Sequence, residues 1–154
     1  MTNTLRRLSS RAHSGFTLLE VMVVLVLIAM LAAAGIPSVT RAIAHNRINN
    51  SAAVIAGDFQ LAFSLAARER RPLVITVNAA GASYRIADRA GTVIRERNLG
   101  DHSDLHVGSM SSSTSTLNIY PNGLSSGPIS VRVTIGDYTQ RITMTRAGQV
   151  RITS

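Results

Sequence analysis

Residues 15–36 read GFTLLEVMVVLVLIAMLAAAGI, an apolar run in which Glu20 is the only charge. The 21 residues from Phe16 to Ile36 match the ~20 that a helix needs to cross a bilayer. A helix also satisfies its backbone groups internally, as lipid demands. Glu20 lies near the edge of the run, in the first turn, where the helix dipole favours a carboxylate. We therefore expect residues 16–36 to form the membrane-spanning part of a long N-terminal helix.

The segment before this run, residues 1–15, reads MTNTLRRLSSRAHSG and is polar and basic. It contains no apolar core of about 7 to 15 residues, so it differs from an ordinary secretory signal. Arg6, Arg7 and Arg11 precede the apolar run. By the positive-inside rule they predict a cytoplasmic N-terminus and an exported C-terminal domain.

The junction Gly15-Phe16-Thr17-Leu18-Leu19-Glu20 resembles the processing site of type IV prepilins and type II secretion pseudopilins. The resemblance implies that an inner-membrane prepilin peptidase cleaves after Gly15, so that residues 1–15 are a leader, and methylates the new amine of Phe16. It also implies that Glu20 assists filament assembly by pairing with the N-terminal amine of a neighbouring subunit. A carboxylate buried in a helix bundle needs such a partner, because an uncompensated buried charge costs several kcal/mol, on the order of 3 to 5.

After the apolar run, residues 37–71 continue as an amphipathic helix. Pro37 removes one helical hydrogen bond and predicts a kink or a loosened turn. The polar residues Arg47, Asn50, Ser51 and Asp58 lie largely off the apolar stripe, which we expect to dock on a sheet. The stripe follows spacings of three and four: Ile48, Ala52, Ile55, Phe59, Ala62 and Ala66.

From Pro72 to the end, residues 72–154 alternate between apolar and polar residues and predict an antiparallel sheet. Gly136-Asp137 predicts a two-residue hairpin of type II′, and residues 88–91 predict a turn. The serine-rich residues 109–115 predict a surface loop. The predicted strands are 73–77, 83–87, 92–97, 105–108, 116–120, 129–135, 138–144 and 149–153.

This order, a long helix followed by a small antiparallel sheet, is an α+β arrangement similar to the pilin fold, and its details resemble the GspH/FimT group of minor pilins and pseudopilins. Three places carry the resemblance: the helix end at Phe63–Leu73, the turn Tyr120-Pro121-Asn122-Gly123, and the closing segment Thr143–Ile152. The resemblance implies a structural subunit, not an enzyme, without a cofactor.

Composition and motifs exclude several kinds of chemistry. The 154-residue chain has no cysteine, so disulfides and zinc-thiolate sites are excluded. Residues 123–127 match the G-x-S-x-G pattern around Ser125, but Pro128 and a strand follow where a nucleophile elbow opens a helix. His102, Asp104 and His106 would share one face of a strand, but nothing else in the chain completes a metal site, so we expect no metal.

The formal charge of +8 falls to +5 without the leader, and every basic residue is arginine. Some FimT-like minor pilins bind DNA in natural transformation through a Gly-Arg-x-Arg sequence. The matching positions here read Gly148-Gln149-Val150-Arg151, with glutamine in place of the first arginine. The candidate DNA contacts are Arg132, Arg141, Arg146 and Arg151, although aromatic residues for base stacking are lacking.

These observations predict a single-pass inner-membrane protein with a periplasmic C-terminal domain. The resemblance implies three kinds of partner: the prepilin peptidase, other pilins or pseudopilins, and the inner-membrane assembly platform. The sequence leaves open a type II secretion pseudopilus or a type IV pilus, with a slight preference for the pilus because of Pro37. Nucleic acid remains open as a further ligand.

Overall fold

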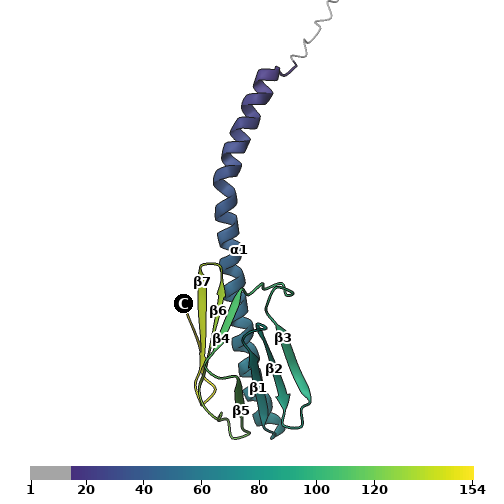
Figure 1. Ribbon diagram of the computed structural model, residues 1–154, viewed down its shortest axis with the longest axis vertical. Helices are drawn as coiled ribbons and strands as arrows, with labels where there is room; N and C mark the ends of the chain where they lie inside the picture. The colour runs from purple at the N-terminus through teal and green to yellow at the C-terminus, as the bar shows by residue number, and fades with distance from the viewer. Residues whose placement is uncertain (1–14) are drawn as a thin grey trace, which may run out of the picture. The chain divides into compact units, whose positions relative to one another are not determined.

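The structure, a computed structural model, describes residues 15–154, except for the side chains of residues 34–37. It contains one helix, α1 (Leu18–Glu69), followed by eight strands (Figure 1). The chain divides into two compact units, Met1–Val39 and Thr40–Ser154. The strands are β1 (Leu73–Asn78), β2 (Ser83–Asp88), β3 (Val93–Asn98), β4 (Ser109–Ser112), β5 (Thr116–Ile119), β6 (Ile129–Ile135), β7 (Tyr138–Met144) and β8 (Val150–Thr153).

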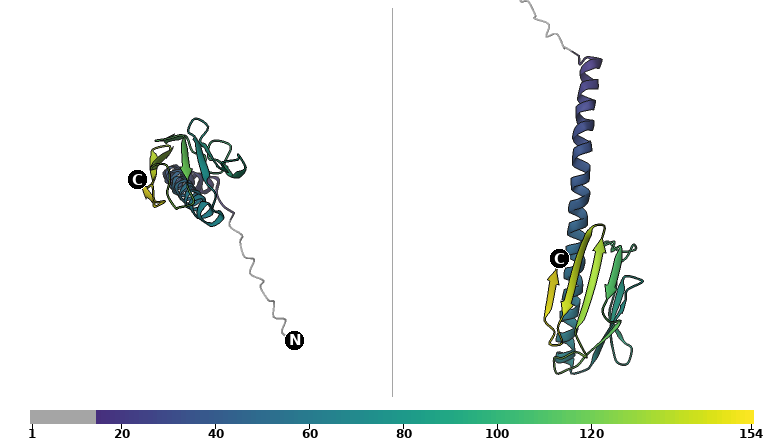
Figure 2. Two further views of the ribbon diagram at one scale, coloured as in Figure 1. Left: turned by 90° about the horizontal axis from the view of Figure 1, so that it is seen from below. Right: turned by 60° about the vertical axis from the view of Figure 1, so that its left-hand side comes forward.

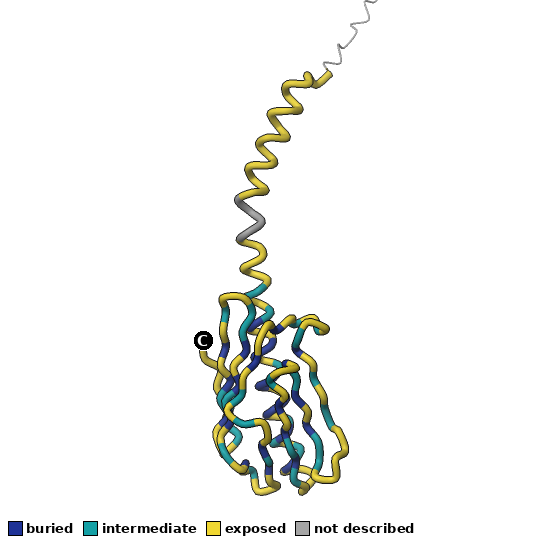
Figure 3. Tube along the Cα trace, in the orientation of Figure 1, coloured by how far each residue is buried: buried dark blue, intermediate teal, exposed yellow. Residues whose placement is uncertain are grey.

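In the first unit, every residue whose side chain is described is exposed to solvent, as the yellow part of the tube in Figure 3 shows. The exposed residues include large apolar side chains such as Leu18, at 82% exposure, and Leu31, at 75%. The helix α1 is long and apolar enough to cross a membrane. Pro37 is among the residues whose side chains are not described, so the kink predicted there stays a prediction.

The second unit contains two four-stranded antiparallel sheets, with strand orders β3-β2-β1-β5 and β4-β6-β7-β8. In Figure 1 both sheets lie beside the C-terminal part of α1, and the right-hand view of Figure 2 shows the yellow β8 at the outer edge of its sheet. Gly136 has a φ of 56°, and Ile135 pairs with Tyr138. The two-residue hairpin between β6 and β7 is therefore confirmed.

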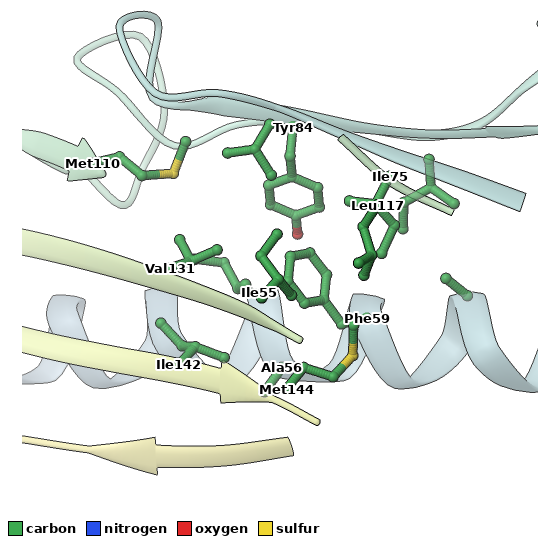
Figure 4. Packing of buried hydrophobic residues seen from close by; sticks show 14 of the residues in the cluster. Ile55, Ala56, Phe59, Ile75, Tyr84, Met110, Leu117, Val131, Ile142 and Met144 are labelled. Atoms are coloured by element: carbon green, nitrogen blue, oxygen red, sulfur yellow. The ribbon is translucent and has the colours of Figure 1, made fainter. Parts of the chain in front are cut away.

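The core of this unit forms where the apolar stripe of α1 meets both sheets. All six residues of the predicted stripe are at most 1% exposed, which confirms the prediction: Ile48, Ala52, Ile55, Phe59, Ala62 and Ala66. Phe59 meets Tyr84 edge to face, with ring centroids 5.8 Å apart (Figure 4). Each such large buried side chain contributes about 1.5 to 3 kcal/mol relative to an exposed one.

The helix ends at Glu69, and Arg70 follows with a φ of 52°. A residue in the left-handed region is a common helix end, and Pro72 two residues later cannot continue the helix. The turn at residues 88–91 is confirmed, because the Gly91 amide donates to the Asp88 carbonyl at 3.1 Å.

Two predictions for this unit were wrong. The strand expected at 105–108 is absent there, and β4 forms instead at Ser109–Ser112, inside the segment expected to be a loop. His106, with a φ of 49°, interrupts an extended chain, whereas Met110 is 7% exposed and pairs with Val133 of β6. One buried methionine among serines is enough to give β4 an inner face.

The second error concerns α1. Ser51 and Asp58 were placed off the apolar stripe, but they are 0% and 6% exposed. The Ser51 hydroxyl donates to the carbonyl of Arg47 at 2.8 Å. Asp58 is held by side chains of β2 and β3, so a polar residue beside the stripe is buried because the sheet supplies its partners.

Candidate functional site

The processing junction lies just before the helix begins. Gly15, Phe16 and Thr17 are outside α1, and the Thr17 Oγ1 accepts a hydrogen bond from the Glu20 amide at 3.2 Å. Thr17 is therefore the N-cap, and Glu20 occupies the third helical position, the T-x-x-E arrangement of a capping box. The peptide bond after Gly15 is consequently outside the helix.

The residues around the junction are open to contact. Phe16 is 80% exposed, and a Cβ added at Gly15 would have no neighbour within 4 Å. Glu20 is also exposed. It lies among large exposed apolar side chains that continue along the helix. The basic residues Arg6, Arg7 and Arg11 lie outside the described residues. The roles predicted for Gly15, Phe16 and Glu20 stay predictions.

A second candidate surface is the solvent face of the sheet β4-β6-β7-β8, which we call the arginine face. Arg132 of β6 lies opposite Arg141 of β7, and Arg151 of β8 lies opposite Thr143. Like charges directly opposed on a sheet are destabilising, and all three arginines are exposed. The other members of the arginine face are hydroxyl residues: Ser109, Ser111, Ser130, Thr134, Thr139, Thr143 and Thr153.

The arginine face has no acidic side chain of its own. Strands β4, β6, β7 and β8 contain no aspartate or glutamate, and no described acid forms an ion pair with Arg132, Arg141 or Arg151. Arg132, Arg141 and Thr153 line an open hollow of about 520 Å³. An accumulation of unpaired positive charge beside hydroxyl donors suits an anionic partner.

The fourth predicted contact, Arg146, differs from the other three. It lies in the turn between β7 and β8, where its Nε donates to the carbonyl of Ser125 at 3.1 Å. The Ser125 amide donates back to the Arg146 carbonyl at 2.9 Å. Arg146 therefore joins two turns of the chain and does not belong to the arginine face.

Ser125 itself has the geometry of a structural residue. It is 0% exposed, and its hydroxyl donates to the carbonyl of Gly127 at 2.7 Å. A nucleophile needs an accessible oxygen and a neighbouring base, and the Ser125 hydroxyl is instead used to hold the turn. The predicted turn at this position is consistent with these bonds.

The histidine-containing segment 101–106 forms a loop between β3 and β4. The described residues contain no group of three or more histidine or acidic side chains able to hold a metal ion. His106, in the left-handed region, turns the chain just before Val107, whose amide donates to the Leu99 carbonyl at 2.7 Å. The segment connects the two sheets.

Gly148 connects the turn before β8 to the helix. Its φ is 79°, and a Cβ at this position would lie 2.6 Å from the Phe63 Cδ1. The helix end and the closing segment, two of the three places that carried the family resemblance, are thus in direct contact. The glycine is needed both for the turn and for the close approach to Phe63.

An ion cluster around the buried Asp58 was not predicted from the sequence. The Tyr84 hydroxyl donates to one carboxylate oxygen at 2.6 Å, the Arg97 Nε donates to the same oxygen at 2.9 Å, and the Arg95 guanidinium donates to the other at 3.2 Å. Burial, followed by the bond to Asp58, raises the pKa of Tyr84. The hydrogen bond to Asp58 raises the pKa of Arg97. An arginine at every second position of an edge strand was the only signal in the sequence.

Comparisons with known proteins agree with this geometry. The model of the prokaryotic N-terminal methylation motif matches residues 10–36, and the model of the type II transport protein GspH matches residues 51–148. No curated protein matches the chain.

Two similar solved structures are those of a minor pilin and a minor pseudopilin. The type IV minor pilin FimU of Pseudomonas aeruginosa has a TM-score of 0.57 at 16% identity, covering 71% of this chain and 90% of its own. The minor pseudopilin EpsH of the Vibrio cholerae type 2 secretion system has a TM-score of 0.54 at 11% identity, covering 70% and 97%. At these identities the similarity shows the fold, which is pilin-like.

The family model covers more than half of the chain and includes the helix end, strands β1 to β7 and the turn up to Gly148. The methylation motif covers the junction at Gly15 and the apolar run that follows it. The α+β pilin-like fold predicted from the sequence is confirmed, and the chain belongs to the GspH family of type II transport proteins.

Proposed function

We propose that the chain is a minor pilin or minor pseudopilin, a structural subunit of a type IV pilus or a type II secretion pseudopilus. The observation that carries the proposal is the exposed apolar surface of α1. The Thr40–Ser154 unit has its own complete core, whereas the large apolar residues from Phe16 to Leu31 pack against nothing in the described chain. Such a surface requires lipid or other subunits to cover it.

The proposed maturation follows from the junction. Residues 1–15 are the leader, which the prepilin peptidase removes by cleaving after Gly15 before methylating Phe16. Residues 16–36 anchor the subunit in the bacterial inner membrane in a single pass, residues 37–71 continue the helix, and residues 72–154 form the periplasmic domain. The non-helical Gly15-Phe16-Thr17 segment supports this assignment, because a peptidase cleaves an extended chain and not a helix.

Assembly places the Glu20 carboxylate among apolar helices, where it pairs with the amine of a neighbouring Phe16. The inner-membrane platform inserts the subunit, and other pilins or pseudopilins then cover its helix. The energetic basis is that a carboxylate in such a bundle needs a positive partner. We propose that the subunit performs no chemistry itself; the serine that matched a nucleophile pattern, Ser125, is buried.

The test compares two Glu→Gln substitutions. Glu20→Gln leaves the Thr17 cap intact, because the Glu20 backbone amide makes that bond. We expect this variant to be inserted and processed normally but to be reduced at least about tenfold in purified filaments, since the lost pairing is worth several kcal/mol. The control, Glu96→Gln, removes a carboxylate whose side chain is 56% exposed and should assemble normally. Equal incorporation of both variants would contradict the proposal.

The arginine face favours a second candidate function, DNA binding in natural transformation. Arg132, Arg141 and Arg151 would contact phosphates, and the lack of aromatic residues on this face predicts binding through the backbone and not through base stacking. Each lost phosphate contact lowers the salt slope of binding by about 0.9 for duplex DNA.

We therefore propose a comparison of two triple variants of the full chain in non-ionic detergent. Changing Arg132, Arg141 and Arg151 to glutamine should lower the salt slope by more than about 2, whereas changing Arg68, Arg85 and Arg89 removes the same charge elsewhere and should lower it little. Equal slopes for both variants, or no DNA binding at low salt, would exclude this function.

A further inference from the structure

We propose that the outer edge of β8 binds an extended acidic segment of a different filament subunit, which joins the sheet β4-β6-β7-β8 as a fifth strand. The inference rests on the assembly function proposed above and names the kind of partner that the sheet domain recognises. Four features carry it: the open backbone edge, the exposed apolar face of β8, the protection of the other sheet edges, and the unpaired charge of the arginine face.

The backbone groups of β8 alternate between the sheet and its open side. The Thr145 amide donates to the Gln149 carbonyl at 2.9 Å, which fixes Thr145 and Gln149 as a hydrogen-bonded pair. In an antiparallel ladder bonded pairs recur at every second residue. Arg151 and Thr153 therefore bond to β7, and Val150 and Ile152 direct their amide and carbonyl groups outward. Among the described residues, 15–154, β8 is the last strand of its sheet, and no strand pairs with its outer edge.

The inner face of β8 is apolar but only partly covered. Ile152 lies opposite Ile142, yet Ile142 is 0% exposed and Ile152 is 43% exposed. A strand added at this edge would place its own side chains next to Ile152 and continue the inner face of the sheet. An apolar residue at the neighbouring position of the partner would therefore be buried, which favours pairing in one register.

The other edges are protected by devices that β8 lacks. Strand β3 turns Arg95 and Arg97 inward to Asp58, and its ladder with β2 is irregular at Ile86/Ala87. Inward charges and bulges are known means of preventing unwanted strand pairing. The edge of β5 is occupied by the following turn, where the Ser126 amide donates to the Asn118 carbonyl at 2.8 Å. Strand β4 is as short as β8, but its one apolar side chain, Met110, is already buried at 7% exposure, so its edge lacks the exposed apolar contact that Ile152 offers.

The charge on the arginine face defines the partner. An incoming strand would place every second side chain beside Arg151 and Thr153 of β8 on the outer face. Arg141 lies one strand further in, on β7, opposite Thr153, and none of the four strands contains an aspartate or glutamate. An aspartate or glutamate beside Arg151 would form a cross-strand pair, worth about 0.2 to 1 kcal/mol. The matching segment thus alternates acidic and apolar residues.

A second copy of this chain does not match. Two β8 edges paired with each other would bring Arg151 of one copy near Arg151 or Thr153 of the other, and neither strand would supply an aspartate or glutamate. The acids that occur within strands, Asp88 and Glu96, already pair with Arg71 and Arg85. The surface therefore selects a different subunit, and its arginines disfavour self-association.

The test uses the full chain in filaments assembled by its native host, with a photoreactive residue at Thr153. The matched control carries the photoreactive residue at Glu96, on the edge strand β3. We expect the Thr153 position, and not the Glu96 position, to crosslink to another subunit within a segment that alternates acidic and apolar residues. Mass spectrometry of the crosslinked peptides identifies the segment.

Three further variants separate strand addition from other contacts. Ile152→Pro removes an outward amide that makes no bond within the chain and leaves the arginine face intact, so the crosslink should fall at least about fivefold, the value of one hydrogen bond. Ile152→Val keeps the amide and should crosslink normally. Arg151→Glu keeps the backbone edge but repels an acidic strand, and should also reduce the crosslink.

The outcomes are distinct. If the chain is absent from filaments, the proposed assembly function fails. If it is present but Thr153 crosslinks to nothing, to a second copy, or to nucleic acid alone, the inference is overturned while the assembly function stands. An Ile152→Pro variant that is incorporated and crosslinks like Ile152→Val would also overturn strand addition.

Discussion

Replacing Gly148 by alanine should separate two costs that this glycine avoids. Gly148 and Gly123 have nearly the same φ, 79° and 78°, but a Cβ at Gly123 would meet nothing within 4 Å, whereas one at Gly148 would lie 2.6 Å from the Phe63 ring. Gly123→Ala is therefore a matched control that measures the backbone strain alone. The difference between the two variants measures the contact with Phe63.

The magnitudes follow from these two positions. Alanine in the left-handed region costs about 1 to 2 kcal/mol, which is the whole expected loss in unfolding free energy for Gly123→Ala. Gly148→Ala adds a steric contact against a ring that packs on the core, and overpacking of this kind costs about 1 to 3 kcal/mol more. We expect Gly148→Ala to lower the free energy of unfolding by about 2 to 5 kcal/mol.

The assay is urea unfolding of the full chain in non-ionic detergent, followed by tyrosine fluorescence, since Tyr84 is buried against Phe59 and the chain has no tryptophan. Phe63→Leu gives a further check, because a smaller side chain should make Gly148→Ala less costly. Equal losses for Gly148→Ala and Gly123→Ala would refute the claim that Gly148 is needed for the close approach to Phe63.

Other predictions concern charges and the helix cap. Asp58→Asn should lower the free energy of unfolding, measured in urea, by about 2 kcal/mol. The cost is moderate for a broken buried ion pair because the arginine partners of Asp58 are partly exposed. Glu96→Gln, which breaks an exposed ion pair, is the control and should change the free energy of unfolding by less than about 1 kcal/mol. The hydrogen bond from the Thr92 amide, with help from the charge of Arg71, lowers the pKa of Asp88. The ionised Asp88 should therefore contribute fully to the free energy of unfolding above about pH 4, and this contribution should be lost as pH falls through the lowered pKa of the folded state. The difference in unfolding free energy between the wild type and Asp88→Asn should thus close on acidification, and a constant difference would contradict this. Thr17→Val should raise amide exchange at Glu20 about fivefold through loss of the cap, whereas Thr17→Ser should not.

Much of the fold followed from periodicity. The apolar stripe of α1 was predictable because spacings of three and four mark one helical face, and all six predicted residues are buried. The β6–β7 hairpin was predictable because Gly136 suits the positive φ of a tight turn. These are local signals, in which the residues that determine the structure are neighbours in the chain.

The errors arose where distant residues decide the structure. Strand β4 depends on Met110 packing opposite Val133, and its serines resemble a loop when considered alone. Asp58 is buried because Tyr84, Arg95 and Arg97, 26 to 39 residues away in sequence, satisfy its carboxylate. Alternation predicted that several arginines share a sheet face, but it did not show that Arg146 bonds to the Ser125 carbonyl.

The most direct test of the central claim is the intact mass of the chain purified from assembled filaments. If the chain is a processed pilin-like subunit, the mass will be that of residues 16–154 with one methyl group on the amine of Phe16. A chain that still begins at Met1, or that begins at any residue other than Phe16, would contradict the account.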